Sequence, residues 1–206
     1  IVASLVGSEM CIRDSPRPSL NTSRKILGFG VPPQQLGIGA SFRYKDWNAS
    51  FLVEGKSGAQ VFSGTNVRLI GYGLHQMTVP SGGREAGFVP DGVLEDGTPI
   101  TQSLDYTQQQ NYWGRYNDVA EAGIYDSDYF RMRQMSVGYT FPKTMLEGTF
   151  IQSASVSLIG KNLFFIHNSV PNVDPESAYN NSNSQGLEFA GMPVPTTVGI
   201  NVNLKF

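Results

Sequence analysis

Apolar and polar residues alternate one for one through the end of the chain, TTVGINVNLKF. This two-residue period predicts an extended strand whose apolar face carries Val198, Ile200, Val202, Leu204 and Phe206. Such a face packs on a second sheet in a sandwich, or contacts lipid in a transmembrane barrel whose polar face lines the lumen. One strand does not distinguish the two folds.

Four further runs alternate in the same way, within residues 37–45, 48–61, 127–141 and 153–165. A phase shift in the third run predicts a β-bulge near Arg133. The connections alternate between short (46–48 and 142–152) and long (63–126 and 167–192), and residues 16–36 are expected to form a loop. Outer-membrane barrels have short periplasmic turns and long extracellular loops. We therefore predict an all-β fold, a fragment of an antiparallel up-and-down transmembrane β-barrel with about five strands and long extracellular loops.

Composition excludes several classes of function. Charged residues are 16% of the chain and the net charge is −2, so no nucleic-acid partner is expected. Cys11 is the single cysteine and His75 and His167 are isolated in the sequence, so no metal site or cofactor is expected. The sequence contains no catalytic constellation, and we predict that the chain is not an enzyme.

The first fifteen residues differ in character from the rest. Residues 4–15, and Met10 to Ser15 above all, resemble the translation of a sequencing adapter. Residues 1–15 are therefore interpreted as an artefact that is not structural, and the natural protein is expected to begin upstream. Residues 37–206 are assigned to the barrel.

Motifs in the third and fourth runs resemble those of SusC/RagA-family TonB-dependent outer-membrane transporters. In that family a strand of the form FxRLRxxxLGYxxP precedes a short turn, a strand ending near GxNLF and a closing strand with a terminal Phe. The matching positions here are Phe130, Arg131, Met132, Arg133, Val137, Gly138, Tyr139, Pro142, Gly160, Asn162, Leu163, Phe164 and Phe206. The resemblance covers about residues 26–206, which correspond to the C-terminal part of the family's barrel.

The resemblance implies energised import of oligosaccharides or peptides across the bacterial outer membrane, through a plugged barrel of about 22 strands. It implies a SusD-like surface lipoprotein that captures substrate, a TonB-ExbB-ExbD complex acting through an N-terminal part absent from this chain, the barrel assembly machinery and outer-membrane lipid as partners. The alternative is a soluble or surface-displayed β-sandwich that binds glycans or adheres. An uncovered apolar face bearing Phe42, Val137, Val156 and Ile200 would favour the barrel.

Four sets of residues are considered for function. Tyr106, Tyr112, Trp113 and Tyr116 crowd the first long loop, where they could contact substrate or a partner, pack the loop against itself, or mark the membrane interface. Arg131 and Arg133 are predicted to face the lumen and to hold a plug or loop through carboxylates. The loop carboxylates Asp174 and Glu176 are expected to be solvated. Phe206 resembles the C-terminal signal that the assembly machinery recognises.

Overall fold

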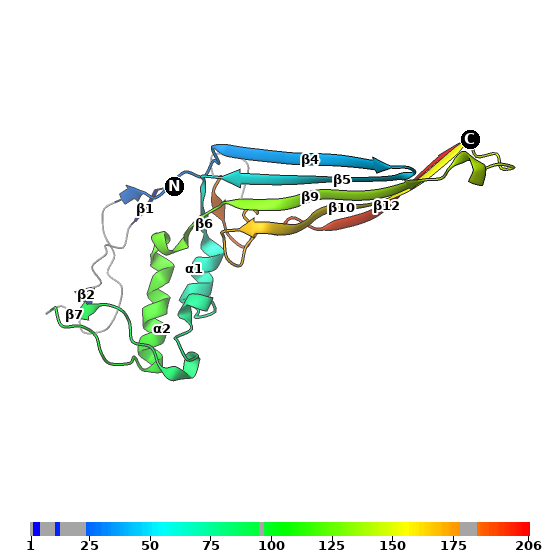
Figure 1. The fold of residues 1–206 in the computed structure, drawn as a ribbon. Coiled ribbons are helices and arrows are strands. Elements are labelled where there is room, and N and C mark those ends of the chain that lie inside the picture. Colours follow the sequence, from blue (N-terminus) through cyan, green and yellow to red (C-terminus); the bar gives the residue numbers. More distant parts are fainter. Residues whose placement is uncertain (1, 5–10, 13–23, 95–96, 178–184) are drawn as a thin grey trace.

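The computed structural model describes residues 2–4, 11–12, 24–94, 97–177 and 185–206. Its largest element is an antiparallel five-stranded sheet of order β12-β10-β9-β5-β4 (Figure 1). Each of these five strands is paired with the one that precedes or follows it among the five along the chain. The strands are β4 (Gln34–Tyr44), β5 (Trp47–Ser57), β9 (Tyr129–Thr140), β10 (Ser153–Asn168) and β12 (Thr197–Lys205). The predicted all-β, up-and-down arrangement of about five strands is confirmed.

One face of this sheet is apolar and uncovered. The pairing aligns its side chains in rows across all five strands, such as Phe42, Ala49, Val137, Leu158 and Ile200. A second row contains Tyr44, Trp47, Tyr139, Val156 and Val202. Most of these large side chains are exposed, and no second sheet in the described residues packs over them. The face is therefore continuous in the way that lipid contact requires, and it does not form a sandwich core.

The opposite face is mainly polar, although Leu52 and Ile159 lie on it. Ser50 and Ser136 share a hydrogen bond of 2.8 Å between their hydroxyl oxygens across β5 and β9. The row beside them contains Arg43, Asn48, Gly138, Ser157 and Asn201. Gly138 lies against the Asn48 amide, where an added Cβ would come within 2.6 Å of its oxygen.

A bulge interrupts β9, as the sequence predicts. Leu52 pairs with Gln134 but Val53 pairs with Met132, so Arg133 has no partner in β5. The extra residue allows Met132 and Met135 to occupy the same apolar face although they are three positions apart. Arg133 and Gln134 consequently both belong to the polar side.

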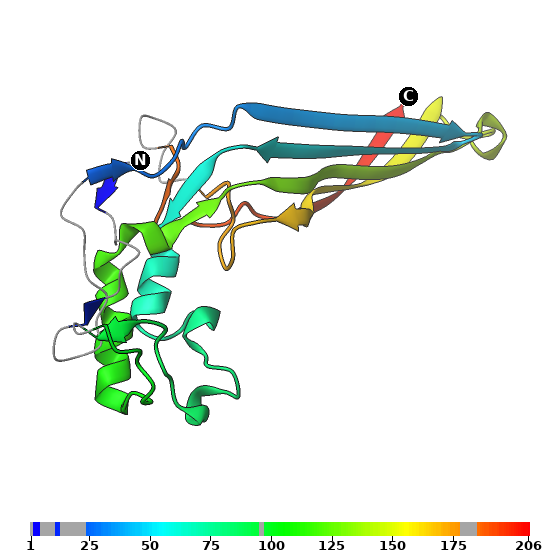
Figure 2. The ribbon, with the colours of Figure 1, turned by 60° about the vertical axis from the view of Figure 1, so that its left-hand side comes forward.

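The two ends of the sheet differ. At one end β4 and β5 are joined by Lys45 and Asp46 alone, so the turn begins one residue earlier than expected and Trp47 is already in the strand. The other turn contains the short helix η5 (Lys143–Met145). The long connections emerge at the opposite end, where helices project from the sheet (Figures 1 and 2).

The first long loop, residues 64–128, has more regular structure than its irregular sequence suggests. Its described residues form two α-helices, α1 (Gly64–Gly71) and α2 (Tyr106–Gly114), which begin after the N-caps Ser63 and Asp105. The short 3₁₀ helices are η1 (Gln76–Thr78), η2 (Arg84–Ala86), η3 (Arg115–Asp118) and η4 (Ala120–Gly123). Among the described residues, no helix is long and apolar enough to cross a membrane.

Short strands complete the fold. A small sheet of order β11-β6-β8 joins β6 (Gln60–Ser63), β8 (Ile124–Asp126) and β11 (Leu187–Glu188), and β6 leads directly into α1. Two further pairs are β1 (Val2–Ser4) with β3 (Arg24–Ile26), and β2 (Cys11–Ile12) with β7 (Val93–Leu94). Residues 16–36 therefore contain β3 and the start of β4 as well as loop.

Most of the adapter-like segment, and residues 16–23 of the expected loop, lie outside the described residues. The strands β1 and β2 fall within residues 1–15. Their presence does not test the origin of the segment, and its interpretation as an artefact stays a prediction.

Candidate functional site: an arginine cluster and a loop cavity

Two arginines of β9 bind carboxylates of the second long loop, residues 169–196. Arg131 Nη2 lies 2.9 Å from Asp174 Oδ2, and Arg131 Nη1 lies 2.6 Å from Glu176 Oε2. Arg133 Nη2 lies 2.8 Å from Glu176 Oε1, and its Nε lies 2.7 Å from Glu54 Oε2 on β5. We call Glu54, Arg131, Arg133, Asp174 and Glu176 the arginine cluster.

The β-bulge contributes to the geometry of this cluster. Asn162 of β10 lies opposite the bulge and has a left-handed backbone with φ of 51°. Its side-chain oxygen accepts a hydrogen bond of 2.9 Å from Arg133 Nη1, and its side-chain nitrogen donates to the Pro195 carbonyl oxygen at 3.3 Å. Asparagine tolerates this backbone conformation better than most residues, and its amide joins β9 to the end of the loop.

Arg131 and Asp174 form the buried part of the cluster. Asp174 Oδ1 accepts the Glu176 amide at 2.9 Å, while Oδ2 accepts the Val194 amide at 3.1 Å. The guanidinium carbon of Arg131 lies 4.1 Å from the ring centroid of Phe165, while its Nε has no hydrogen-bond partner among the described atoms. A buried charge pair is tolerated where hydrogen bonds satisfy most of its polar atoms, as they do for Asp174.

Glu176 is held in its ionised form. Burial by itself raises the pKa of this carboxyl, but hydrogen bonds from Arg133, Tyr129 and Arg131 outweigh burial and lower the pKa to about 2. The Tyr129 hydroxyl donates to Glu176 Oε1 at 2.8 Å. The expectation that Asp174 and Glu176 are solvated is therefore wrong, because the folded loop brings both against the sheet.

A second set of contacts joins the two long loops to each other. Glu188 is buried and accepts hydrogen bonds from the hydroxyls of Ser63 at 2.7 Å and Thr65 at 2.6 Å, at the start of α1. The buried Asn66 side chain donates to the Pro171 carbonyl oxygen and accepts from Asn172, each at 2.9 Å. The helices of the first loop are thus fixed to the second loop, which the arginine cluster fixes to the sheet.

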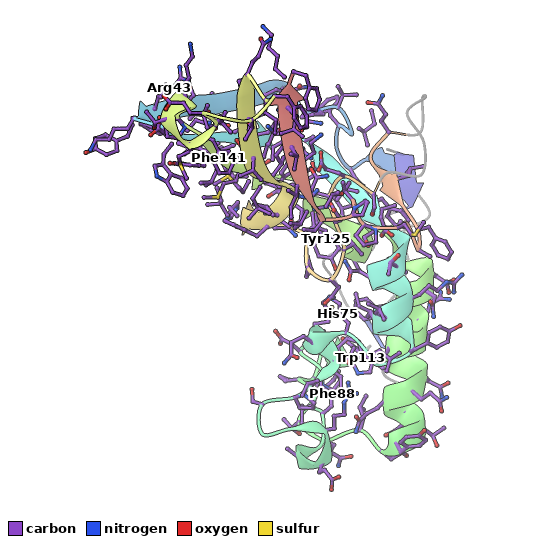
Figure 3. All side chains as sticks on the ribbon, turned by 90° about the vertical axis from the view of Figure 1, so that its right-hand side faces the viewer. Arg43, His75, Phe88, Trp113, Tyr125 and Phe141 are labelled. Atoms are coloured by element: carbon purple, nitrogen blue, oxygen red, sulfur yellow. The ribbon has the colours of Figure 1, made fainter. Side chains whose placement is uncertain are left out.

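The four aromatic candidates separate into different environments. Tyr112 and Trp113 are only 3% and 8% exposed, and they form the loop core with Ile70 and Leu104. Tyr116 packs against this core, whereas Tyr106 is 81% exposed. Figure 3 places Trp113 and Phe88 in the helical end of the molecule, far from Arg43 and Phe141 on the sheet. Packing of the loop against itself accounts for the buried Tyr112. Contact of the four aromatic residues with a ligand or partner stays a prediction.

A cavity of about 290 Å³ lies beside this aromatic core. It is lined by Gly71, Tyr72, Gly73, Thr78, Pro80, Arg84, Tyr106, Gln109, Gln110 and Trp113. We call it the loop cavity. It brings two of the predicted aromatic residues, Tyr106 and Trp113, to one site together with residues that the sequence did not single out.

Phe206 ends the chain beside the short turn. Its ring stacks on that of Phe150, with centroids 5.6 Å apart and an interplanar angle of 18°. Both rings are exposed. Recognition of Phe206 during assembly stays a prediction.

Together these features define a class of protein. The strands are long enough to cross a bilayer, one face is apolar and exposed, and the connections are short at one end and folded at the other. Trp47 and Tyr139 pair near the short-turn end, with ring centroids 4.9 Å apart, as in the aromatic girdle of a membrane barrel. The chain is a segment of an outer-membrane β-barrel.

Comparison with known proteins shows which barrel proteins the chain is similar to. No protein-family model matches the chain. The chain is 25% identical over 189 residues to the TonB-dependent receptor P3 of Formosa agariphila, across 89% of this chain and 17% of that protein. The RagAB peptide importer in its open-open state matches the whole chain with a TM-score of 0.63 at 12% identity, over 22% of the solved chain. Its closed-closed state gives a TM-score of 0.62, also at 12% identity, over 21% of that chain.

These matches confirm the resemblance to SusC/RagA-like TonB-dependent transporters and, with it, the outer-membrane location. The relatives are named as a receptor and an importer, and neither name is that of an enzyme. The chain spans about a fifth of the length of the proteins it matches. Within the described residues no group of three or more His, Cys, Asp or Glu side chains could hold a metal ion.

Proposed function

We propose that the chain is the C-terminal wall of a TonB-dependent importer that carries oligosaccharides or peptides across the outer membrane. The observation that carries this proposal is the five-stranded sheet with one lipid-compatible face and a polar face to which a folded loop is bound. Similarity to the TonB-dependent receptor P3 and to the RagAB importer supports it.

The proposal gives each face and end of the sheet a role. The apolar face contacts outer-membrane lipid, the polar face borders the lumen, and the short turns lie in the periplasm. Arg131 and Arg133 then face the lumen and hold the second long loop against the wall near the outer end. The helices of the first loop stand at the cell surface, where they meet substrate or a SusD-like lipoprotein.

In this proposal, transport also requires partner proteins and a plug domain in addition to this segment. A TonB-ExbB-ExbD complex provides energy by acting on a plug domain elsewhere in the protein, and the barrel assembly machinery inserts the strands. These partners are inferred from the resemblance to the family. No step of the proposal requires a cofactor.

Import is tested by deleting the complete gene in its host and measuring uptake of labelled oligosaccharides and peptides. We expect one class of substrate to be lost from the deletion strain and restored by the wild-type gene but not by a gene lacking residues 37–206. Uptake should also stop when TonB is removed. Unchanged uptake of every tested substrate, or uptake independent of TonB, would contradict the proposal.

Sidedness is tested separately by adding protease to intact cells. Cleavage within residues 64–128, with the turn at residues 142–152 protected until the outer membrane is permeabilised, is the expected pattern. The reverse pattern would place the helices in the periplasm.

A further inference from the structure

The loop cavity is lined by one face of α2 and by the end of α1 with the turns that follow it. Tyr106, Gln109, Gln110 and Trp113 occur at positions i, i+3, i+4 and i+7, which lie on the same side of a helix. Tyr106 is largely exposed, and Tyr72, which also lines the cavity, is exposed as well. The cavity therefore offers flat apolar ring surface and side-chain amides within one small space.

Among the described residues that line the cavity, Arg84 is the one with a charged side chain. It begins the short helix η2 and is exposed. Arg115, Arg131 and Arg133 all have carboxylate partners, but no described residue forms an ion pair with Arg84. A guanidinium without a partner binds a carboxylate through two parallel hydrogen bonds, which lysine cannot reproduce.

The neighbouring groups leave Arg84 available to a ligand. No aspartate or glutamate is among the described residues that line the cavity. Gln109 donates its side-chain NH₂ to the Leu104 carbonyl oxygen at 2.9 Å, and its side-chain oxygen accepts no hydrogen bond from the described residues. Trp113 is held in the aromatic core with centroids 5.0 Å from Tyr112 and Phe88, so this wall is preformed.

We propose that the loop cavity binds one sugar ring that carries a carboxylate, with Tyr106 stacked on the ring and Arg84 paired with the carboxylate. This inference rests on the proposed function and names the substrate class of the cell-surface loop. Aromatic rings present apolar faces that match the C–H face of a sugar, and amides of Gln109 and Gln110 suit its hydroxyls. The volume of about 290 Å³ is at the small end for ligand pockets and fits one unit of a chain whose remainder lies outside.

A peptide fits the cavity less well. Extended peptides are commonly bound by main-chain hydrogen bonds to an exposed strand edge. The described lining of the loop cavity comes from helices and turns, so its polar contacts are made by side chains. Such contacts suit a ligand whose own polar groups are hydroxyls and a carboxylate.

The test measures binding by the complete outer-membrane protein in detergent, using isothermal titration calorimetry. The probes are trigalacturonate, neutral galactotriose and the tripeptide Glu-Tyr-Glu. The variants are Arg84→Gln and Tyr106→Ala, both at exposed positions whose change leaves the loop core intact. Arg115→Gln is the matched control, because Arg115 is a partly exposed arginine of the same loop that pairs with Asp118 and is not among the described residues lining the cavity.

We expect trigalacturonate to bind more tightly than galactotriose, and Arg84→Gln to weaken it about ten- to hundred-fold, as expected for hydrogen bonds to a charged group. Tyr106→Ala should weaken the binding of both sugars, whereas Arg115→Gln should leave the binding of both unchanged. Equal binding of the two sugars, tighter binding of the peptide, binding unaffected by Arg84→Gln, or no binding of trigalacturonate would each overturn the proposal. TonB-dependent uptake of a neutral sugar or peptide in the deletion experiment would leave import standing while this inference fails.

Discussion

Replacement of Arg131 by methionine should release the second long loop from the sheet. The substitution keeps a long apolar side chain beside Phe165 but removes both hydrogen bonds to the loop carboxylates. Asp174 would then remain buried without its cation. Glu176 would retain Arg133 and Tyr129.

The size of the destabilisation follows from the burial of the ion pair between Arg131 and Asp174. The Arg131 and Asp174 side chains are 5% and 3% exposed, and removing one partner of a buried ion pair costs about 3–5 kcal/mol. Since a free-energy difference of 1.4 kcal/mol changes a population ratio tenfold, the open form of the loop should become about 10² to 4 × 10³ times more populated. Replacing both Arg131 and Asp174 by apolar residues should cost less than Arg131→Met alone.

Amide hydrogen exchange of the complete protein in detergent measures this opening. The informative amides are those of Glu176 and Val194, which donate to Asp174 and should exchange faster in the variant. The control is Arg115→Met, whose ion pair with Asp118 is 38% and 55% exposed and is worth about 0–1 kcal/mol. Unchanged exchange at both amides in Arg131→Met would refute the role assigned to the arginine cluster.

Three further outcomes are expected. Because hydrogen bonds lower the pKa of Glu176 to about 2, its ionised form stabilises the docked loop above pH 4.5, and this contribution should be lost as the pH falls toward 2. Amide hydrogen exchange of the second long loop, measured as a function of pH, checks the direction of this effect. Faster exchange as the pH rises from 5 to 7 would contradict it. Leu158→Arg on the apolar face should lower the free energy of unfolding, measured with urea in lipid, by about 2–4 kcal/mol. Ser157→Arg on the polar face should lower it much less. Phe206→Ala should lower the amount of protein assembled in the outer membrane, yet reduce the stability of the folded protein by only about 0.5–1.5 kcal/mol, the value of its stacking on Phe150. Equal assembly of Phe206→Ala and wild type would remove the signal role.

The strands could be predicted from the sequence because a two-residue period determines which side chains share a face. The same period located the bulge at Arg133, since one extra residue shifts the apolar phase. The turn consists of residues 45–46 and not of 46–48, because Trp47 and Asn48 already pair with Tyr44 and Arg43 in the strands.

The helices of the first loop were missed although local signals exist. Asp105 and Gln108 form a capping box, and both reciprocal hydrogen bonds are present at 2.8 and 2.9 Å. The apolar pattern of α2 is weak because one side of the helix lines the loop cavity with Tyr106, Gln109 and Gln110. A short helix with a polar and aromatic face gives little periodic signal.

Long-range ion pairs could not be predicted in the same way. Arg131 and Asp174 are 43 positions apart, and their contact depends on how an irregular loop folds back on the sheet. Sequence alone identified the arginines as binders of carboxylates but treated the loop carboxylates as solvated. Likewise, Arg84 gains significance only when the structure brings it and Tyr106 into the lining of one cavity, where no described residue forms an ion pair with it.

The central claim is that one face of the five-stranded sheet contacts lipid. It is tested by attaching a fluorescent probe to a cysteine at position 200 or at position 201, in a Cys11→Ser background, and measuring quenching by brominated lipids. The Ile200 position should be quenched strongly and the neighbouring Asn201 position weakly, because successive residues of β12 point to opposite faces. Equal quenching at the two positions, or stronger quenching at Asn201, would contradict the barrel account.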